Sequence, residues 1–296
     1  MLKFEQIIDG VWLLKVPFEG MWTGVFLFDS EEKMVLDCGP SAAAIDEYVM
    51  PALKDLGVEP SDIKWVLNTH CHGDHAHGNP RFMELTGAKL AAYDNACMKF
   101  LDPLFYSRKT RTHFPEFSPK APAQIPRQVP DLVLHDGDEF LGRFVIYSTP
   151  GHDTECISVL DKKTNSLFTG DSIQLRGTIG PAGQGVGFYK YIDDYSYTLD
   201  RVEKIDPDNL FCSHDYLPEG FAFVGKENAR RCIKICQEAY AAYEKRTKEL
   251  LDAGITDVKE VAKELIAIYD HPLPEQLMMP MYTAEEHMKK LGYKPE

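Results

Sequence analysis

The chain has 296 residues, of which 44% are hydrophobic and 26% charged, and its formal net charge at pH 7 is −14. This length allows a substantial core, and no stretch has the ~20 uninterrupted apolar residues that a membrane helix needs. The acidic balance opposes nucleic-acid binding, which requires a basic surface, but still allows a small anionic substrate held by a local patch.

The N-terminal segment carries Glu5 and Asp9 among its apolar residues and has no small-residue cleavage site. We therefore expect no signal peptide, no membrane partner and a cytoplasmic location, with the seven cysteines reduced. Cys232 and Cys236 lie one helical turn apart without a CxxC or histidine partner. They are expected to be buried small side chains rather than metal ligands.

The first half of the chain alternates short apolar runs with turn residues, which predicts strands at 11–16, 24–28 and 33–38. Ser41 is a suitable N-cap and Gly57 a suitable C-terminal stop for a helix over 41–57. The run at 63–67 predicts a buried strand, and it is followed directly by "NTHCHGDHAHGN". Loops after the carboxyl ends of strands hold the sites of open α/β sheets, so this cluster is expected to lie in a site.

A helix near 80–86, a strand at 88–93 and a short helix near 94–101 continue the alternation. Residues 102–131 then break it with prolines and aromatic residues. This segment is long for a simple connection and too aromatic for a disordered loop, which predicts a lid or pocket-lining excursion.

The second half of the chain predicts strands at 131–140, 144–150, 156–161, 166–171 and 209–214, with a helix at 192–205. A glycine-rich loop at 176–191 lacks the GK[ST] ending of a phosphate-binding P-loop. From about residue 226, apolar residues recur at helical spacing, which predicts core-facing helices, with a dimer surface as the alternative. We expect a catalytic domain at 1–225 and a helical extension, packed on it, at 226–296.

The histidine cluster has the composition of a metal site. His70, His72, Asp74 and His75 follow the spacing HxHxDH on a loop leaving a strand, so that their side chains can point into one small volume. Imidazole and carboxylate suit zinc, iron or manganese, and the lack of a matching thiolate set argues against a structural zinc site. Three further ligand-type residues follow later predicted strands, and all seven are expected to converge at one sheet edge: His152, Asp171 and His214.

This pattern resembles the metallo-β-lactamase fold superfamily over roughly residues 8–220. HxHxDH, then PGH, GD and a final histidine, is the binuclear signature of that superfamily. The resemblance implies an α/β (α+β) protein with a four-layer αββα sandwich, here followed by a C-terminal helical extension. It also implies two divalent transition metal ions, zinc first, with iron or manganese as alternatives.

Carried over by position, the resemblance assigns His70, His72 and His152 to the first metal ion. The second ion is assigned to Asp74, His75 and His214, with Asp171 as the bridging ligand. His77 has no place in the pattern. The resemblance leaves two nearby carboxylates as expected hydrogen-bond acceptors for ligating imidazoles: Asp153 and Asp215.

The two ions imply a hydrolase in which a shared hydroxide attacks an electrophilic carbonyl or phosphorus. Asp74 would orient the nucleophile as well as ligate, and one tyrosine of the stretch 189–197 would stabilise the oxyanion: Tyr189, Tyr191, Tyr195 or Tyr197. Asp171 disfavours a true β-lactamase, which lacks aspartate there, and His72 disfavours the flavodiiron oxidoreductases, which carry glutamate. Glyoxalase II-like thioesterases and acyl-homoserine lactonases share the whole ligand set.

The helical tail is similar in layout to the 2-aminobenzoylacetyl-CoA thioesterases of the quinolone-signal response type. An apolar acyl or aryl pocket is expected from Trp22, Phe105, Tyr106, Phe114, Phe188, Tyr189, Tyr191, Leu277 and Met278. The sequence thus predicts a thioesterase or lactonase acting on a small molecule. The alternatives are a phosphodiesterase with the same metal centre, and a regulatory or interaction protein with incidental hydrolysis. Besides the substrate, the expected partner is a second copy of the chain in a homodimer.

Overall fold

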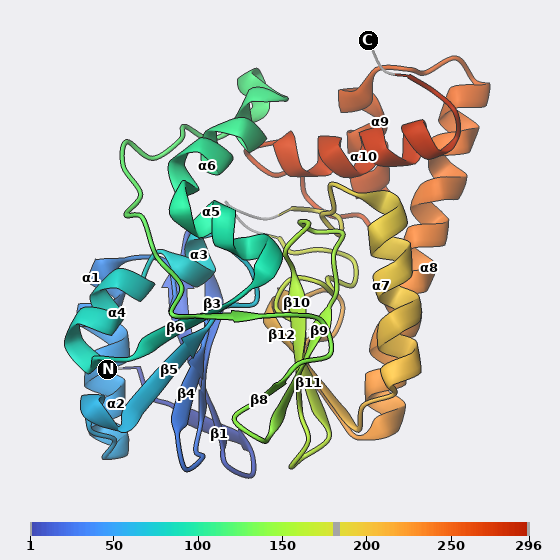
Figure 1. Ribbon diagram of the computed structural model, residues 1–296. Helices are drawn as coiled ribbons and strands as arrows, with labels where there is room; N and C mark the ends of the chain where they lie inside the picture. Colours follow the sequence, from blue (N-terminus) through green and yellow to red (C-terminus); the bar gives the residue numbers. More distant parts are fainter. Residues whose placement is uncertain (1, 180–183, 295–296) are drawn as a thin grey trace.

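The computed structural model describes residues 2–179 and 184–294. Two β-sheets pack face to face, and helices cover the outer face of each sheet (Figure 1). The molecule is therefore a four-layer αββα sandwich, which confirms the predicted fold class. Among the described residues, no helix is long and apolar enough to cross a membrane.

The first sheet has seven strands in sequence order. Its first four strands pair antiparallel, and the pairs from β4 to β7 are parallel. The strands are β1 (Glu5–Ile8), β2 (Val11–Phe18), β3 (Met21–Phe28), β4 (Lys33–Leu36), β5 (Ile63–Leu67), β6 (Lys89–Tyr93) and β7 (Leu132–Leu134).

The second sheet has six strands in the order β13-β12-β11-β10-β9-β8, antiparallel except for β11 and β12. They are β8 (Glu139–Phe140), β9 (Phe144–Ser148), β10 (Ile157–Asp161), β11 (Ser166–Phe168), β12 (Asn209–Tyr216) and β13 (Gly220–Val224).

The single strand predicted at 131–140 is wrong, because the chain crosses between the sheets there. β7 pairs with β6 in the first sheet, and β8 pairs with β9 in the second. A turn separates them: the Asp138 carboxylate accepts the backbone N–H of His135 at 2.8 Å, and Gly137 has a φ of 85°. A left-handed φ at this position favours glycine and ends the extended run.

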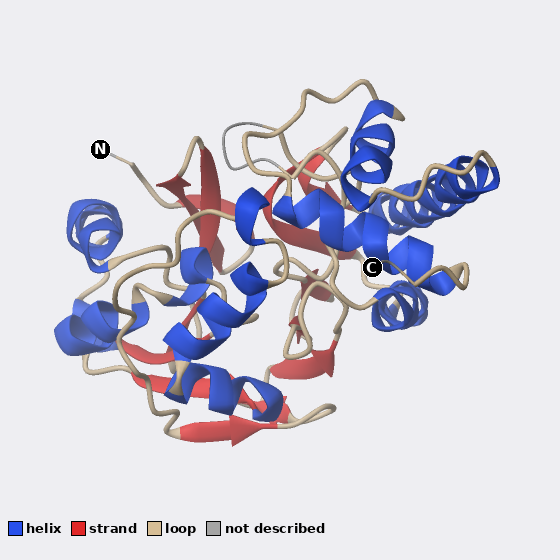
Figure 2. Ribbon diagram, turned by 90° about the horizontal axis from the view of Figure 1, so that it is seen from above, coloured by secondary structure: helices blue, strands red, loops and turns tan. Residues whose placement is uncertain are grey.

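The helices lie in three groups. The outer layer of the first sheet contains α1 (Ala42–Ala44), α2 (Met50–Leu56) and α4 (Asn79–Thr86), and the outer layer of the second contains α7 (Ile192–Ile205) and α8 (Lys226–Asp252). The remaining helices are α3 (Gly73–Ala76), α5 (Cys97–Leu101), α6 (Pro103–Thr112), α9 (Val258–Ala267) and α10 (Met278–Lys290). Figure 2, seen from above, shows helices lying over one end of the two sheets.

The predicted helix over 41–57 is present. The Ser41 hydroxyl caps it by accepting the N–H of Ala44 at 3.1 Å, and Gly57 ends it with a φ of 76°. A π-helical turn, Ile45–Val49, joins α1 to α2. The excursion at 102–131 contains a helix that the sequence pattern did not indicate: α6 begins after Asp102, whose carboxylate accepts the N–H of Phe105 at 3.2 Å.

The central core lies between the sheets and is rich in phenylalanine: Phe26, Phe28, Phe144, Phe168 and Phe211. The first half of α8 packs with α7 against the second sheet, so it forms part of the sandwich's outer layer. Cys232 and Cys236 are buried in this cluster, as predicted. The second half of α8 packs with α9 and α10 in a separate cluster.

His287 on α10 makes the stability of this last cluster depend on pH. It is fully buried, and its Nε2 accepts the Tyr189 hydroxyl at 2.5 Å. Burial, with a smaller contribution from Lys290, lowers the pKa of His287 to about 3. Since the unfolded chain gains this proton below pH ~6.5 and the folded protein does not, stability falls from there toward pH ~3, by up to about 1.4 kcal/mol per pH unit.

The variant His287→Gln removes this titration. The difference in unfolding free energy between wild type and variant is therefore expected to shrink by about 2 kcal/mol between pH ~7 and pH ~5. Denaturant titrations at the two pH values measure it. His135→Gln, which replaces a histidine with a 63% exposed side chain on a turn, is measured alongside it for comparison. A constant difference between wild type and His287→Gln would contradict the assignment.

Candidate metal centre

Asp37 organises the loop that carries the histidine cluster. It follows β4 with a φ of 60°, is fully buried, and accepts the backbone N–H and the hydroxyl of Thr69, both at 2.8 Å. The same carboxylate accepts Nδ1 of His75 at 2.8 Å. One buried anion thus holds the loop after β5 and the first turn of α3 in register. Asp37 is not among the predicted site residues, because a lone aspartate at a strand end carries no motif.

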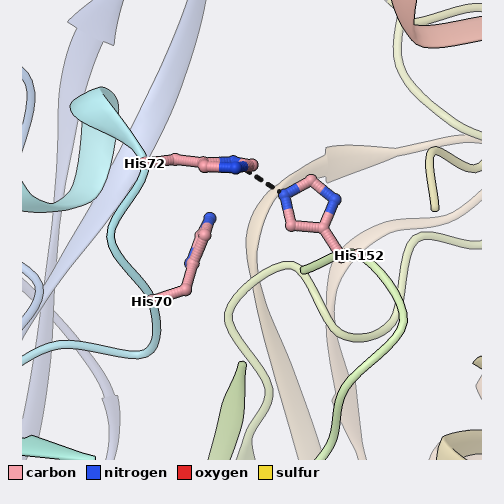
Figure 3. A group of neighbouring side chains, drawn as sticks. All are labelled: His70, His72 and His152. Carbon is pink, nitrogen blue, oxygen red and sulfur yellow. Dashed lines mark hydrogen bonds between the residues drawn. The ribbon is translucent and has the colours of Figure 1, made fainter. Parts of the chain in front are cut away.

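The seven predicted ligand residues lie together at one end of the sandwich. Each of three subsets has potential ligand atoms within 4.8 Å of one another: His70, His72 and His152; His70, His75 and Asp171; Asp74, His75 and His214. Figure 3 shows the first subset, in which Nδ1 of His72 lies 2.9 Å from Nε2 of His152. The imidazole nitrogens lie so close together that a cation bound between them would offset their mutual repulsion.

Asp171 lies between the subsets. Its Oδ2 is 3.6 Å from Nε2 of His75 and of His152, and its Oδ1 is 3.4 Å from Nε2 of His214. The preceding Gly170 allows this position: a Cβ there would lie 2.5 Å from Thr69. The carboxylate therefore faces both halves of the centre, which is the position that the resemblance assigned to a bridging ligand.

The imidazoles are oriented by hydrogen bonds from the nitrogen that faces away from the centre. His152 Nδ1 donates to the carbonyl of Phe188 at 3.0 Å, and His214 Nδ1 donates to the carbonyl of Trp22 at 2.7 Å. His72 uses Nε2 instead, 3.3 Å from Asp153. The three rings thus present Nε2, Nε2 and Nδ1 to the centre, which is the arrangement of ligating histidines.

Several atoms at the centre lack partners. Nε2 of His70, Nε2 of His75 and Oδ1 of Asp171 are buried and form no hydrogen bond with any described residue. Buried polar atoms without a partner are costly and rare in folded proteins. Nitrogen and carboxylate oxygen atoms gathered in this way fit divalent transition metal ions.

The charges of His70, His152 and Asp171 suit the same use. Burial lowers the pKa of His152 to about 3, so the ring is neutral and its lone pair is free at neutral pH. Burial, together with the neighbouring His75, holds the pKa of His70 well below its usual range. Burial raises the pKa of Asp171, but His214 and His75 outweigh this effect and keep it ionised.

A buried charge network supports His72 from outside the centre. Asp153 accepts from Lys99 and Lys190 as well as from His72, and Lys99 also donates to Glu155. Lys99 comes from α5 and Lys190 from the loop before α7, so the network joins distant segments. Burial raises the pKa of Asp153, but Lys190 and the hydrogen bond from His72 more than offset this and hold it well below its usual range.

The prediction for Asp153 as an imidazole partner therefore matches its position, whereas the prediction for Asp215 is wrong. Asp215 is exposed and accepts the indole N–H of Trp22 at 2.8 Å instead of an imidazole. It is one residue from His214 on β12, and the alternation of a strand turns the two side chains to opposite sides. His77 lies outside the three ligand subsets, as expected.

The predicted pocket residues divide into two groups. Phe188 lies with its ring 5.0 Å from that of His152, and Tyr191 is 40% exposed close to the network around Asp153. The centre of the Tyr106 ring lies 5.7 Å from Nζ of Lys99, and the Trp22 ring packs edge-on against that of Phe221 beside β12. Phe188 of the first group thus contacts a candidate ligand directly, whereas Tyr191, Tyr106 and Trp22 lie beside residues that support the ligands.

The other predicted pocket residues lie elsewhere in the structure. Tyr189 is buried and stacks on Tyr195 at 4.2 Å, so the expectation that either would reach the substrate is wrong. Tyr197 is exposed and accepts from Arg201, which leaves Tyr191 as the remaining candidate of that stretch. Leu277 and Phe114 pack against the cluster of α8 to α10. Met278 is buried, and Phe105 is exposed at the surface.

Helix α10 supplies an aromatic residue that the pocket prediction omitted. The Tyr282 ring stacks on His113 at 5.1 Å and lies 6.0 Å from that of Phe188. Its hydroxyl donates to the carbonyl of Thr110 at 2.8 Å. A chain of contacts therefore runs from His152 through Phe188 to α10 and α6. Tyrosine within "MMPMY" was a detectable signal for this position.

The sandwich and the clustered imidazoles and carboxylates at its edge define an α/β protein with a candidate binuclear metal centre. The sequence model of the Metallo-beta-lactamase superfamily matches residues 23–214, and the chain belongs to this superfamily. This confirms the family expected from the HxHxDH pattern and the later ligands.

Individual relatives are distant. The chain is 27% identical over 282 residues to the Beta-lactamase-like protein 2 homolog of Drosophila melanogaster, covering 91% of this chain and 82% of that protein. It is 25% identical over 242 residues to a hydroxyacylglutathione hydrolase of Methylococcus capsulatus, covering 79% and 78%. A crystal structure of a metallo-beta-lactamase family protein from Thermus thermophilus shares the fold, with a TM-score of 0.70 at 18% identity over 97% and 95% of the two chains.

Proposed function

We propose that this protein is a hydrolase with two divalent metal ions that cleaves a carboxylic ester-type bond, a thioester first and a lactone second. The observation that carries the proposal is the set of seven ligand-type side chains. Asp171 lies between two groups of them, and buried nitrogens of the set have no hydrogen-bond partner among the described residues. The first ion would be held by His70, His72 and His152. The second would be held by Asp74, His75 and His214, with Asp171 shared.

Metal ions at such a centre supply Lewis acidity and a hydroxide nucleophile at neutral pH. The chain's own residues do the rest. Of the seven, His72 and Asp74 have the most exposed side chains, at 29% and 14%, so substrate would approach from their side. Asp74 lies 3.2 Å from Nε2 of both His75 and His214 and can orient the nucleophile.

The substrate carbonyl would lie near Phe188 and Tyr191. Phe188 shields His152 from water, and the Tyr191 hydroxyl stays protonated because burial raises its pKa. A protonated phenol can donate to an oxygen that gains negative charge during the reaction. The named relative from Methylococcus capsulatus acts on a hydroxyacylglutathione, which is a thioester, and this supports a thioester as the first candidate.

A substrate panel tests the proposal. Purified protein, loaded with zinc, iron or manganese, is assayed with acyl-thioesters, acyl-homoserine lactones and p-nitrophenyl phosphodiesters. We expect thioester hydrolysis to be the fastest reaction and the variant His72→Ala to lose it. Faster phosphodiester hydrolysis would favour the alternative reaction. Protein that binds no transition metal and an unchanged rate in His72→Ala would refute a metal-dependent hydrolase.

A further inference from the structure

Helix α6 turns one face toward the protein and the other toward solvent. Arg108 and Lys109 are exposed, whereas Tyr106, Thr110 and Arg111 are partly buried. Tyr106 faces Lys99, and the Thr110 carbonyl accepts the Tyr282 hydroxyl at 2.8 Å. The inner face of α6 thus packs beside α5 and α10, and Arg111 belongs to this face.

Arg111 has no acidic partner among the described residues. Its Nη1 donates to the carbonyl and the hydroxyl of Ser107, at 2.8 and 2.7 Å, on its own helix. Its Nε is buried and has no acceptor among the described residues. Six other arginines form ion pairs with carboxylates: Arg81, Arg143, Arg201, Arg230, Arg231 and Arg246. In a chain with 46 acidic residues, a half-buried arginine without such a partner calls for an anion from outside.

The contacts of Thr110, the residue before Arg111, place this part of α6 beside the candidate centre. The Thr110 carbonyl accepts the hydroxyl of Tyr282, whose ring lies 6.0 Å from that of Phe188, and the Phe188 ring lies 5.0 Å from that of His152. Burial lowers the pKa of Arg111. The charge of the exposed Glu19, on the turn between β2 and β3, offsets this only in part, and Glu19 forms no hydrogen bond with Arg111.

We propose that Arg111 binds an anionic oxygen group of the substrate, a carboxylate or a phosphate, while the reacting carbonyl lies at the metal centre. This inference rests on the proposed function and narrows its substrate class to thioesters whose thiol part carries negative charge. A guanidinium offers a planar pair of donors that matches both carboxylate and phosphate. Such a contact, made equally before and during the reaction, strengthens substrate binding without changing turnover.

The test compares one acyl group on three thiols: coenzyme A, which carries phosphates, glutathione, which carries carboxylates, and the neutral N-acetylcysteamine. The variant Arg111→Gln is expected to raise KM about 10- to 100-fold for one or both anionic thioesters, with kcat within about twofold. The neutral thioester should keep its KM. Which anionic substrate responds identifies phosphate or carboxylate, and Arg111→Lys should restore part of the affinity.

Arg108→Gln is the matched control, since it removes the same charge from the exposed face of the same helix. Equal KM changes in both variants, or equal changes for neutral and anionic thioesters, would overturn the proposal. Calorimetric titration of free coenzyme A and glutathione separates it from the proposed function. Binding that is lost in Arg111→Gln supports the anion site even if no thioester is cleaved, and unchanged or absent binding contradicts it.

Discussion

Replacing Asp171 by asparagine is expected to reduce bound metal from two ions to one or none and to lower kcat/KM by about 10³-fold or more. The carboxylate faces three imidazoles through Oδ2 and His214 through Oδ1. Asparagine keeps the shape but loses the charge, and its amide nitrogen cannot ligate. Elemental analysis of the purified variant and steady-state kinetics measure the two effects.

Asp215→Asn is the control for this experiment. Asp215 follows His214 but is exposed and bonds to the indole of Trp22, so its variant should retain both ions and a rate near that of wild type. If Asp171→Asn kept two ions and the wild-type rate, the assignment of Asp171 as the shared ligand would be wrong.

The two carboxylates that support imidazoles are expected to affect different halves of the centre. Asp37→Asn should weaken the ion held by Asp74, His75 and His214, because Asp37 orients His75. Asp153→Asn should weaken the ion held by His70, His72 and His152, because Asp153 lies against His72. Losses of about 10- to 100-fold in affinity are typical when such a partner is removed.

Stepwise metal titration against a chelator resolves the two affinities in each variant. Asp37→Asn should also lower the unfolding free energy of the metal-free protein, by about 1.5–3 kcal/mol for each weakened hydrogen bond to the buried charge. Two outcomes would contradict this account. Both variants could lower the affinity for the same ion equally, or neither variant could lower the affinity for either ion.

The C-terminal helices belong to the architecture of the centre. The carbonyl of Phe188 orients His152, and the Phe188 ring lies beside Tyr282 of α10. The same helix anchors to Tyr189 through His287. A segment that the sequence presented as an extension therefore supports the loop that carries a ligand partner.

Most of the ligand set could be predicted from the sequence because its members are marked locally. His70, His72, Asp74 and His75 lie within six consecutive positions, and each later ligand directly follows or ends a strand-like run. The errors have a different origin. Tyr189 looked like a pocket residue because "FYKY" alone does not say which side chains turn inward, and packing against Tyr195 decided it.

The sequence by itself determined the family, the sandwich fold and the identity of the candidate ligands, since residue type and short spacing carry that information. The tertiary structure alone decided which nitrogen each imidazole presents to the centre, and which buried charges hold it there. Asp37 is 38 residues from His75, and Lys99 is 54 from Asp153. These partners are brought together by the parallel strands of one sheet and by the packing of separate segments, and no local pattern records such contacts. The unpaired Arg111 is of the same kind, because its lack of a partner among the described residues exists only in the folded protein.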